Sequence, residues 1–364
     1  MTTEPRDTRI RIEVVRLRVP LVRPYKLAFG PVTAFDTLVV LMHDDTGRRG
    51  AGEATLLTGY TDETIEGAWD GARALATALA GASAREVARK VLAVAPSSPF
   101  LATAFMTALD ALHAHPLLTV DAPSRVPILG ILNETDDGAL EAEIERLVSA
   151  GYRTLKVKVG FDVESDLRRV ALIQARVAGR ARLRLDANQG YTAQQARRFA
   201  GALDPAGIEL FEQPCAAGDW DAHMSVVPHS TVPLMLDESI YGLADIERAA
   251  RLGAARYVKV KLMKLVTLDG LVAAIERIRA LGMVPVLGNG VACDLGCWME
   301  ACVAARHIDN AGEMNGFLKP HAGLLGQPLA FEDGAIVLQP GFRGVPEEDA
   351  LARYEIDRHG GRPA

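Results

Sequence analysis

The sequence predicts an α/β protein of two domains, in which a closed barrel of parallel strands follows an N-terminal α+β domain. The barrel is indicated by apolar segments that recur every 24 to 28 residues from residue 126 onward. One strand, one helix and two loops occupy about that length, so the spacing is typical of a repeated βα unit. Eight such segments are also the number that closes a barrel with a side-chain-filled interior. Their centres are Leu129, Val157, Leu185, Leu210, Leu236, Val260, Val286 and Gly312.

The first 125 residues show strands followed by helices instead of an alternation. Residues 10–20 alternate between apolar and mostly charged side chains, which predicts an amphipathic strand. Residues 37–43 and 48–54 flank a polar turn that contains Gly47, so they predict a hairpin. Residues 62–115 are rich in alanine and have helical periodicity with two breaks. This order is typical of an α+β domain.

Amphipathic segments with helical periodicity lie between the predicted barrel strands, and a seventh, at 220–227, is shorter and weaker. After Gly312 two short apolar segments, 328–331 and 335–338, indicate strands that we expect to return and complete the first domain, since two strands alone are marginal. We therefore place the barrel at residues 126–324, and the other domain at 1–125 with 325–364. The six clear helices are predicted at 139–150, 164–178, 193–203, 243–252, 268–281 and 295–306.

Composition excludes several classes of protein. The 364 residues carry a formal net charge of -6 with a pI near 5.8, which argues against electrostatic binding to nucleic acid or anionic membranes. Residues 1–7 lack the apolar core of a signal peptide, and no apolar run approaches the ~20 residues of a membrane helix. We expect a cytoplasmic protein. Its four cysteines lie in the C-terminal half, and we expect Cys293 and Cys297 to be ordinary reduced helix residues.

Two lysines stand one residue apart in the second predicted barrel strand. Because side chains alternate along a strand, Lys156 and Lys158 share one face while Val157 shares the other face with its aliphatic neighbours. A buried ammonium costs several kcal/mol unless an anion meets it. The pattern therefore predicts carboxylates in the same interior space.

Three carboxylates follow at matching intervals. Asp186, Glu212 and Asp237 each stand at the end of a short apolar run, 26 and then 25 residues apart. The C-terminal ends of barrel strands meet at one rim, so the three side chains are expected to lie together. Three close anions require protons or a cation, and hard oxygen ligands fit Mg²⁺, with Mn²⁺ as an alternative, better than zinc. Ordinary surface salt bridges are the structural alternative, which the common spacing disfavours.

A third lysine follows 24 residues after Asp237. Lys261 shares a strand face with Lys259, whereas Lys264 has the outward parity, so we favour Lys261 as the functional residue. Lysines on strands that precede and follow the acids would flank a bound ion. That arrangement suits removal of a proton from carbon next to a carboxylate, with the cation stabilising the enediolate that develops. Lys158 would be the base, and Lys156 together with the nearby cation would lower its pKa.

These motifs together resemble the enolase superfamily, specifically its muconate lactonizing enzyme subgroup. The resemblance implies a modified TIM barrel, (β/α)7β, with an N-terminal α+β capping domain completed by the C-terminus. It also implies Mg²⁺ on the three carboxylates, and Lys158 and Lys261 as the acid/base pair. The mandelate racemase subgroup has a histidine at the seventh strand, where this sequence has Leu287-Gly288-Asn289-Gly290. The motifs are Lys156-x-Lys158, Asp186-Ala-Asn188, Glu212-Gln-Pro214, Asp237-Glu238-Ser239 and Lys261-Leu-Met-Lys264.

The same resemblance implies substrate contacts from two capping loops, residues 20–34 and 55–62, and from the eighth strand. Dipeptide epimerases carry Asp-x-Asp in that strand, where this sequence has Glu313-Met314-Asn315, which disfavours dipeptide epimerisation. Asp294 and Trp298 are weaker candidates, because they could equally be a helix cap and a core residue. The full set of predicted substrate-binding residues is Tyr25, Phe29, Leu57, Tyr60, Asn188, Glu238, Asp294, Glu313 and Asn315.

The resemblance leaves the second half of the reaction open. Return of a proton on the opposite face gives racemisation or epimerisation of an amino acid derivative, which we favour. Loss of a β-leaving group gives a muconate-type cycloisomerase, or a dehydratase or o-succinylbenzoate synthase-like lyase. A Schiff-base aldolase and a non-catalytic binding barrel are alternatives from other classes. The expected ligand is a small-molecule carboxylate, and the resemblance also implies a homo-oligomer.

Overall fold

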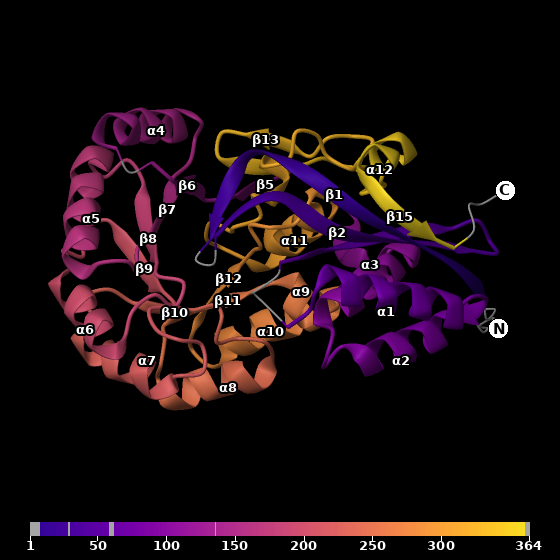
Figure 1. Cartoon of the computed structure of the whole chain (residues 1–364), viewed down its shortest axis with the longest axis horizontal. Coiled ribbons are helices and arrows are strands. Elements are labelled where there is room, and N and C mark those ends of the chain that lie inside the picture. The colour runs from indigo at the N-terminus through magenta and orange to yellow at the C-terminus, as the bar shows by residue number, and fades with distance from the viewer. Residues whose placement is uncertain (1–7, 28–29, 58–61, 135, 361–364) are drawn as a thin grey trace.

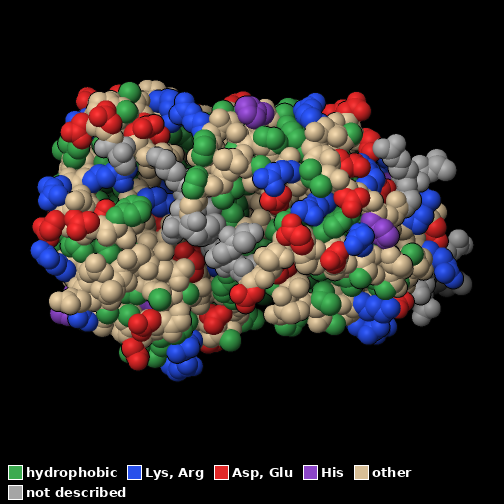
Figure 2. All heavy atoms as spheres, in the orientation of Figure 1, with side chains coloured by type: hydrophobic (Ala, Val, Ile, Leu, Met, Phe, Trp, Pro, Cys, Tyr) green, Lys and Arg blue, Asp and Glu red, His purple; other side chains and the backbone are tan. Residues whose placement is uncertain are grey.

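The structure, a computed structural model, describes residues 8–27, 30–57, 62–134 and 136–360. Its two halves lie side by side in Figure 1, with the parallel barrel on the left and the antiparallel sheet with helices α1 to α3 on the right. Each half has its own hydrophobic core. On the face in Figure 2 acidic and basic side chains are interspersed, so no large single-sign patch appears there.

The antiparallel sheet has the strand order β15-β1-β2-β3, with the short β4 (Ala82–Ser83) paired to β1. Its three long strands are β1 (Arg9–Leu27), β2 (Gly30–Asp44) and β3 (Arg49–Leu56). Three helices accompany it: α1 (Ile65–Ala78), α2 (Ala84–Val94) and α3 (Pro99–Leu112). Gly50 lets α3 approach β3, since a Cβ there would lie 2.2 Å from the carbonyl oxygen of Ala108. The predicted hairpin and helical region are confirmed.

The expectation of a loop at residues 20–34 was wrong. Strand β1 runs on to Leu27, and β2 starts at Gly30, so the two form a long ribbon. Their register shifts between Pro20 and Tyr25, after which Tyr25 pairs with Val32 and Leu27 with Gly30. The prolines therefore interrupt the ladder without ending it, as an edge ribbon permits.

Seven parallel strands form the barrel in the order β12-β11-β10-β9-β8-β7-β6. Gly312 closes it without forming a strand of its own: its N–H donates to Pro127 at 2.9 Å and its oxygen accepts from Leu129 at 2.9 Å, while Glu313 donates to Leu287 at 3.0 Å. The predicted eight positions are thus confirmed, with an irregular eighth. The strands are β6 (Gly130–Leu132), β7 (Thr154–Lys158), β8 (Arg182–Asp186), β9 (Ile208–Glu212), β10 (Leu234–Leu236), β11 (Tyr257–Val260) and β12 (Val284–Leu287).

Helices cover the outside of this sheet, as Figure 1 shows for α4 to α8. They lie within three residues of every predicted helix boundary. A short additional helix, α9 (Leu262–Leu265), follows β11 directly and was not predicted. The others are α4 (Asp137–Ser149), α5 (Val163–Val177), α6 (Ala193–Ala202), α7 (Trp220–Val226), α8 (Leu243–Leu252), α10 (Leu268–Ala280) and α11 (Asp294–His307), with 3-10 turns η1 (Pro116–Leu118), η2 (Val227–His229) and η3 (Gly316–Leu318).

The C-terminal segment differs from our expectation in one respect. The hairpin β13 (Ala330–Glu332) and β14 (Ala335–Leu338) pairs with β5 (Ser124–Pro127), which leads directly into the barrel. The return to the first sheet is made later, by α12 (Glu348–Tyr354) and β15 (Glu355–His359), which pairs with β1. The weakly apolar sequence of β15 gave no strand signal.

The β1–β2 ribbon reaches the barrel and is attached there. Leu21 forms an antiparallel bridge with Pro320, and Val22 donates to the carbonyl of Lys319 at 2.8 Å. This attachment brings Tyr25 to the rim formed by the C-terminal strand ends.

Within the described part of the chain, no helix has the length and apolar character needed to span a membrane.

Candidate active site

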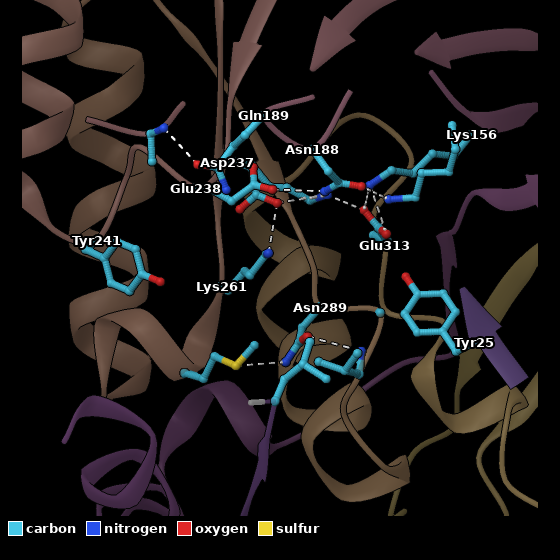
Figure 3. A pocket seen from close by; sticks show the side chains of 17 residues that line it. Tyr25, Lys156, Asn188, Gln189, Asp237, Glu238, Tyr241, Lys261, Asn289 and Glu313 are labelled. Atoms are coloured by element: carbon cyan, nitrogen blue, oxygen red, sulfur yellow. Dashed lines mark hydrogen bonds and ion pairs between the residues drawn. The ribbon is translucent and has the colours of Figure 1, made fainter. Parts of the chain in front are cut away.

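A cavity of about 330 Å³ opens at the C-terminal ends of the barrel strands (Figure 3). The barrel contributes charged side chains, while the N-terminal domain contributes Tyr25 and Leu57. Both of these side chains are buried. The predicted residues that line the cavity are Tyr25, Leu57, Lys156, Lys158, Asn188, Asp237, Glu238, Lys261 and Glu313.

Lys156 joins three acids from three strand ends. Its Nζ lies 3.0 Å from Asp186 Oδ2, 3.1 Å from Glu212 Oε2 and 2.8 Å from Glu313 Oε2. The side chain is only 3% exposed, so these ion pairs replace its hydration. The prediction that Lys156 and Lys158 face carboxylates in the interior is confirmed.

Lys158 follows Lys156 by two residues on β7 and therefore lies closer to the rim. Its Nζ is 2.6 Å from Asp186 Oδ2 and also donates to Asn188 Oδ1. Asn188 in turn donates through Nδ2 to Glu238 Oε1 at 2.9 Å, and its backbone N–H donates to Asp186 Oδ1 at 2.9 Å. Asn188 adopts φ +40°, a left-handed conformation that Asn tolerates better than most residues. It therefore orients both Lys158 and Asp186.

Strand β11 supplies a second lysine group. Lys259 is 2% exposed, and its Nζ binds Glu212 Oε1 at 2.9 Å and Glu313 Oε2. Lys261 follows the strand and binds Asp237 Oδ2 at 2.8 Å, as Figure 3 shows. Together β7 and β11 place lysines on both sides of the three intervening strands that carry the acids.

The outward orientation predicted for Lys264 was wrong. Helix α9 begins immediately after Lys261, so strand parity no longer applies. The chain turns Lys264 back toward the rim, where its Nζ lies 3.1 Å from Asp237 Oδ1 and donates to the carbonyl of Ile240 at 2.8 Å. Burial, with Lys261 close by, lowers the pKa of Lys264 to about 8 despite the Asp237 carboxylate.

Acids at the rim differ in their electrostatic surroundings. Burial raises the pKa of Asp186, but Lys156 and Lys158 outweigh it and bring the pKa down to about 2. Asp237, with its lysines, has a pKa well below the usual range in spite of burial. Glu212 lies between two other acids, and burial and Asp186 raise its pKa despite its two lysine partners. Glu212, the middle one of the three acids, is therefore the acid whose negative charge the lysines neutralise least.

Protein groups alone raise the pKa of Lys158. Burial lowers it, but the Asp186 carboxylate outweighs both burial and Lys156, so the net pKa is raised. Our expectation of a lowered pKa rested on the neighbouring ammonium and a bound cation and left out the carboxylate in direct contact, and it stays a prediction for the cation-bound protein. Lys158 can be a base only where a further positive charge offsets Asp186.

The three predicted metal ligands lie on consecutive strands but are bridged by lysines. Lys156 bridges Asp186 and Glu212, and Lys259 lies 2.9 Å from Glu212 and 3.7 Å from Asp237. In residues 8–27, 30–57, 62–134 and 136–360, no three His, Cys, Asp or Glu residues are close enough to form a ready metal cluster. Glu212 Oε2 is nevertheless buried without a hydrogen-bond donor, apart from the ion-pair contact at 3.1 Å. Three carboxylates on consecutive strands, with one oxygen of the middle acid lacking a hydrogen bond, fit a hard divalent cation.

Two predicted substrate residues, Asp294 and Asn315, are not among the residues that line the cavity. Asp294 is buried at the start of α11, where its carboxylate accepts from the backbone N–H groups of Leu324 and Leu325 at 2.9–3.0 Å. Asn315 accepts from Lys319 at 2.8 Å and donates to the carbonyl of Leu129 at 3.2 Å. Both side chains thus have protein partners. Phe29 and Tyr60 lie outside the described residues.

Trp298 packs on Phe342 with 5.9 Å between ring centroids, which agrees with the core alternative.

Other residues of the site were missed or undervalued by the sequence analysis. Gln213 is fully buried, and its Oε1 accepts from the backbone N–H groups of Asp237 at 2.9 Å and Ser239 at 3.2 Å. Its place in the Glu-Gln-Pro motif was a usable signal, and so was the parity of Lys259.

Comparison with known proteins places the chain in a family. A family model described as enolase C-terminal domain-like matches residues 139–345. The chain is 31% identical to L-Ala-D/L-Glu epimerase from Clostridium acetobutylicum, over 82% of this chain and 85% of that protein. It is 25% identical to N-succinyl-L-Arg/Lys racemase from Bacillus cereus, over 81% of each.

A solved structure supports the fold. The dipeptide epimerase from Cytophaga hutchinsonii, complexed with Mg and the dipeptide D-Ala-L-Val, matches with a TM-score of 0.86 at 22% identity, over 96% of this chain and 98% of that one. The parallel barrel with its N-terminal antiparallel sheet is thus a known architecture. The chain belongs to the enolase superfamily, and its resemblance to the muconate lactonizing enzyme subgroup is confirmed.

Proposed function

We propose that this protein racemises or epimerises an amino acid derivative by Mg²⁺-dependent removal of the proton next to a carboxylate. One observation carries the proposal: Lys158 and Lys261 line the same cavity from opposite sides of the three acids. Lys158 contacts Asp186, and Lys261 contacts Asp237. Two amines that flank one site can exchange a proton with either face of a carbon held between them.

Asp186, Glu212 and Asp237 would hold the cation, with Mn²⁺ as a substitute for Mg²⁺. When bound, the ion would supply positive charge to the substrate carboxylate and to the negative charge that develops there as the proton leaves. Gln213 keeps the backbone of Asp237 in place through the hydrogen bond at 2.9 Å. The three acids fit the ion because their carboxylate oxygens are suitable ligands and because they stand on consecutive strands.

The two lysines have complementary roles. Nζ of Lys158 takes the α-proton from one stereoisomer, and Nζ of Lys261 returns a proton to the opposite face; the roles reverse for the other stereoisomer. Asn188 accepts from Lys158 Nζ and keeps that nitrogen directed into the cavity. Tyr25 and Leu57, buried in the cavity wall, limit the access of water from the side of the N-terminal domain.

The relatives support this reaction. They are named as an epimerase and a racemase of amino acid derivatives, and the solved dipeptide epimerase is a Mg complex. The muconate-type cycloisomerase and the lyases share the first half of the reaction, so product analysis separates them.

The test is ¹H NMR of wild-type enzyme with Mg²⁺ in D₂O, with a panel of L-amino acid derivatives. We expect deuterium at the α-carbon together with the D-isomer, and neither after EDTA treatment. A product with a new double bond or a lactone would instead indicate the lyase or cycloisomerase reaction. Complete absence of exchange across the panel would contradict the proposal.

The cytoplasmic location and the homo-oligomer stay predictions. Light scattering with size-exclusion chromatography tests the oligomeric state.

A further inference from the structure

The peptide group between Lys261 and Leu262 is held at both of its ends. Its carbonyl oxygen, on Lys261, accepts from the N–H groups of Lys264 at 3.0 Å and Leu265 at 3.3 Å, as at the start of a helix. Its N–H, on Leu262, donates to Oε1 of Glu300 at 2.9 Å. Glu300 thus binds the backbone directly beside the second lysine of the proposed acid/base pair.

This peptide stands where the chain changes direction. Strand β11 ends at Val260, Lys261 has extended backbone angles of φ −137° and ψ 138°, and α9 begins with Leu262. The last pair of the β11–β12 ladder is Val260 with Leu287. The N–H of Leu262 therefore needs a partner outside the sheet, because the residue is buried and an unpaired buried N–H is unfavourable. Glu300 supplies that partner.

Holding this peptide fixes the direction in which Lys261 leaves the backbone. The torsion ψ of Lys261 is the rotation between its Cα and this peptide group, so an immobilised peptide also fixes where Cβ points. From there Nζ reaches the cavity and lies 2.8 Å from Asp237 Oδ2 (Figure 3). On the other side of the acids, Asn188 orients Lys158 through the side chain itself. The two lysines are therefore positioned by different devices.

The helix that carries Glu300 is anchored to two other segments. At the start of α11, the backbone N–H of Cys293 donates to Glu53 of β3 at 2.7 Å. The next residue, Asp294, accepts from the backbone N–H of Leu324 at 2.9 Å. Glu300 follows within the second turn and is only 2% exposed. Its carboxyl group therefore has a fixed place from which to hold the peptide.

The hydrogen bond from Glu300 does not require a negative charge. Burial raises the pKa of Glu300 to about 7, although the N–H of Leu262 and the ammonium of Lys261 lower it. Its Oε2 is buried without a hydrogen-bond partner in the part of the chain that the structure describes. A proton on Oε2 would leave Oε1 able to accept from Leu262 as before. An uncharged acceptor of the same length should therefore replace Glu300.

We propose that Glu300 is a positioning residue for Lys261: by holding the Lys261–Leu262 peptide, it directs the Lys261 ammonium to one face of the substrate. The inference rests on the proposed two-lysine reaction. Loss of a residue that only stabilises the fold would slow exchange at both faces alike. Loss of Glu300 should slow exchange at one face, so the two isomers of one substrate distinguish these roles.

The test is α-deuterium exchange in D₂O with Mg²⁺, measured for the most active of the L-amino acid derivatives and for its D-isomer. The isomer that depends on Lys261 is the one that Lys261→Ala no longer exchanges. In Glu300→Leu we expect kcat/KM for that isomer to fall at least ~10-fold and for the other isomer to change less than ~2-fold, because a small misplacement of a reacting group is costly.

Equal changes for the two isomers in Glu300→Leu would overturn the positioning role and leave the racemisation in place. No exchange of either isomer by wild type, or exchange of both by Lys261→Ala, would overturn the positioning role together with the proposed function. The two rates are compared within one preparation, so their ratio does not depend on the fraction of folded enzyme.

Two further variants separate position from charge, and they also serve if Glu300→Leu does not fold. Glu300→Gln keeps the length and an acceptor oxygen, so the ratio of the two isomers should stay within ~2-fold of wild type. Glu300→Asp keeps the charge but is one methylene shorter, so the ratio should shift at least ~3-fold in the direction expected for Glu300→Leu. No shift in Glu300→Asp, or a shift in Glu300→Gln, would overturn the proposal.

Glu53→Leu is the matched control. It removes another buried acid that accepts from a backbone N–H next to α11, but that N–H belongs to Cys293 and not to Leu262. The variant should keep the wild-type ratio of the two isomers, whatever its effect on the urea midpoint. A shift as large as that of Glu300→Leu would show that disturbed packing of α11 is sufficient, and would overturn the role assigned to Glu300.

Discussion

Buried acids occur in two regions of this molecule, and the two regions neutralise them differently. At the barrel rim, Asp186, Asp237 and Glu313 lie against lysine ammonium groups. Between β3 and α11, Glu53 and Glu300 are also buried, but they accept hydrogen bonds from backbone N–H groups: Cys293 at 2.7 Å and Leu262 at 2.9 Å. The second carboxylate oxygen of each of these two has no hydrogen-bond partner in the described residues.

The pKa values of the acids follow this difference. Burial alone raises the pKa of every one of them. At the rim the lysines outweigh burial and lower the pKa of Asp186 to about 2. In the second region burial, with Asp294 nearby, raises the pKa of Glu53 to about 8, and burial raises that of Glu300 to about 7. Among these buried acids the pKa is lowered only where lysines outweigh burial, as at Asp186, Asp237 and Glu313.

The largest expected effect is that of Asp237→Asn at the rim. The change removes an anion that binds Lys261 and Lys264 and would ligate Mg²⁺. We expect Mg²⁺ affinity, measured by calorimetry, to fall more than ~100-fold and exchange activity to fall at least ~1,000-fold. Asp269→Asn, with a side chain 86% exposed, is the control. Equal Mg²⁺ binding by wild type and Asp237→Asn would favour the non-catalytic barrel.

The next effect is a pH dependence of stability that Glu53 imposes. Because its folded pKa is about 8 and its ordinary value 4.5, the unfolded chain loses this proton at lower pH than the native protein. The wild-type free energy of unfolding should therefore fall as pH rises from about 4.5 to about 8, by up to ~5 kcal/mol. Urea titrations of Glu53→Gln should lack the Glu53 contribution to this fall and keep the smaller one of Glu300, so the variant should be more stable than wild type above pH 8. Exposed Glu276→Gln should retain the fall; a parallel profile for Glu53→Gln would contradict the assignment.

Glu313→Gln should have the opposite sign. Removing the charge leaves Lys156 and Lys259 buried with less compensation, and breaking a buried pair costs about 3–5 kcal/mol. We expect a lower urea midpoint than wild type at pH 7, where Glu53→Gln should raise it. A change within experimental error for Glu313→Gln would show that the other acids at the rim, Asp186, Glu212 and Asp237, compensate both lysines without it.

The smallest effect is expected at Glu300. Its pKa of about 7 limits the pH-dependent loss to the interval from about 4.5 to 7, and to about 3 kcal/mol. Glu300→Gln should remove that loss while its Oε1 still accepts from Leu262. Urea titrations at pH 5, 7 and 9 should show no further gain between pH 7 and 9, in contrast to Glu53→Gln.

Sequence reasoning found what depends on periodicity. The spacing of apolar segments predicted the barrel strands and their helices, and strand parity placed Lys156 and Lys158 opposite acids. The position of Asp186, Glu212 and Asp237 on consecutive strand ends follows from the same repeat. Whether those acids hold Mg²⁺ stays a prediction.

What could not be predicted depends on local departures from a repeat. Helix α9 starts directly after Lys261 and turns Lys264 inward, which no parity rule anticipates. The β1–β2 ribbon continues past Pro20 because pairing resumes at Tyr25. Asp294 binds the backbone of a segment 30 residues away, a contact that only the folded chain reveals.

The most direct test of the central claim is α-deuterium exchange by Lys158→Ala and Lys261→Ala, measured separately with the L- and D-isomers of one substrate in D₂O. If the two lysines serve opposite faces, each variant should lose racemisation, by about 10²- to 10⁴-fold, yet exchange only one isomer, and the two variants should retain opposite isomers. Exchange of both isomers by either variant, or full turnover after both lysines are replaced, would contradict the account.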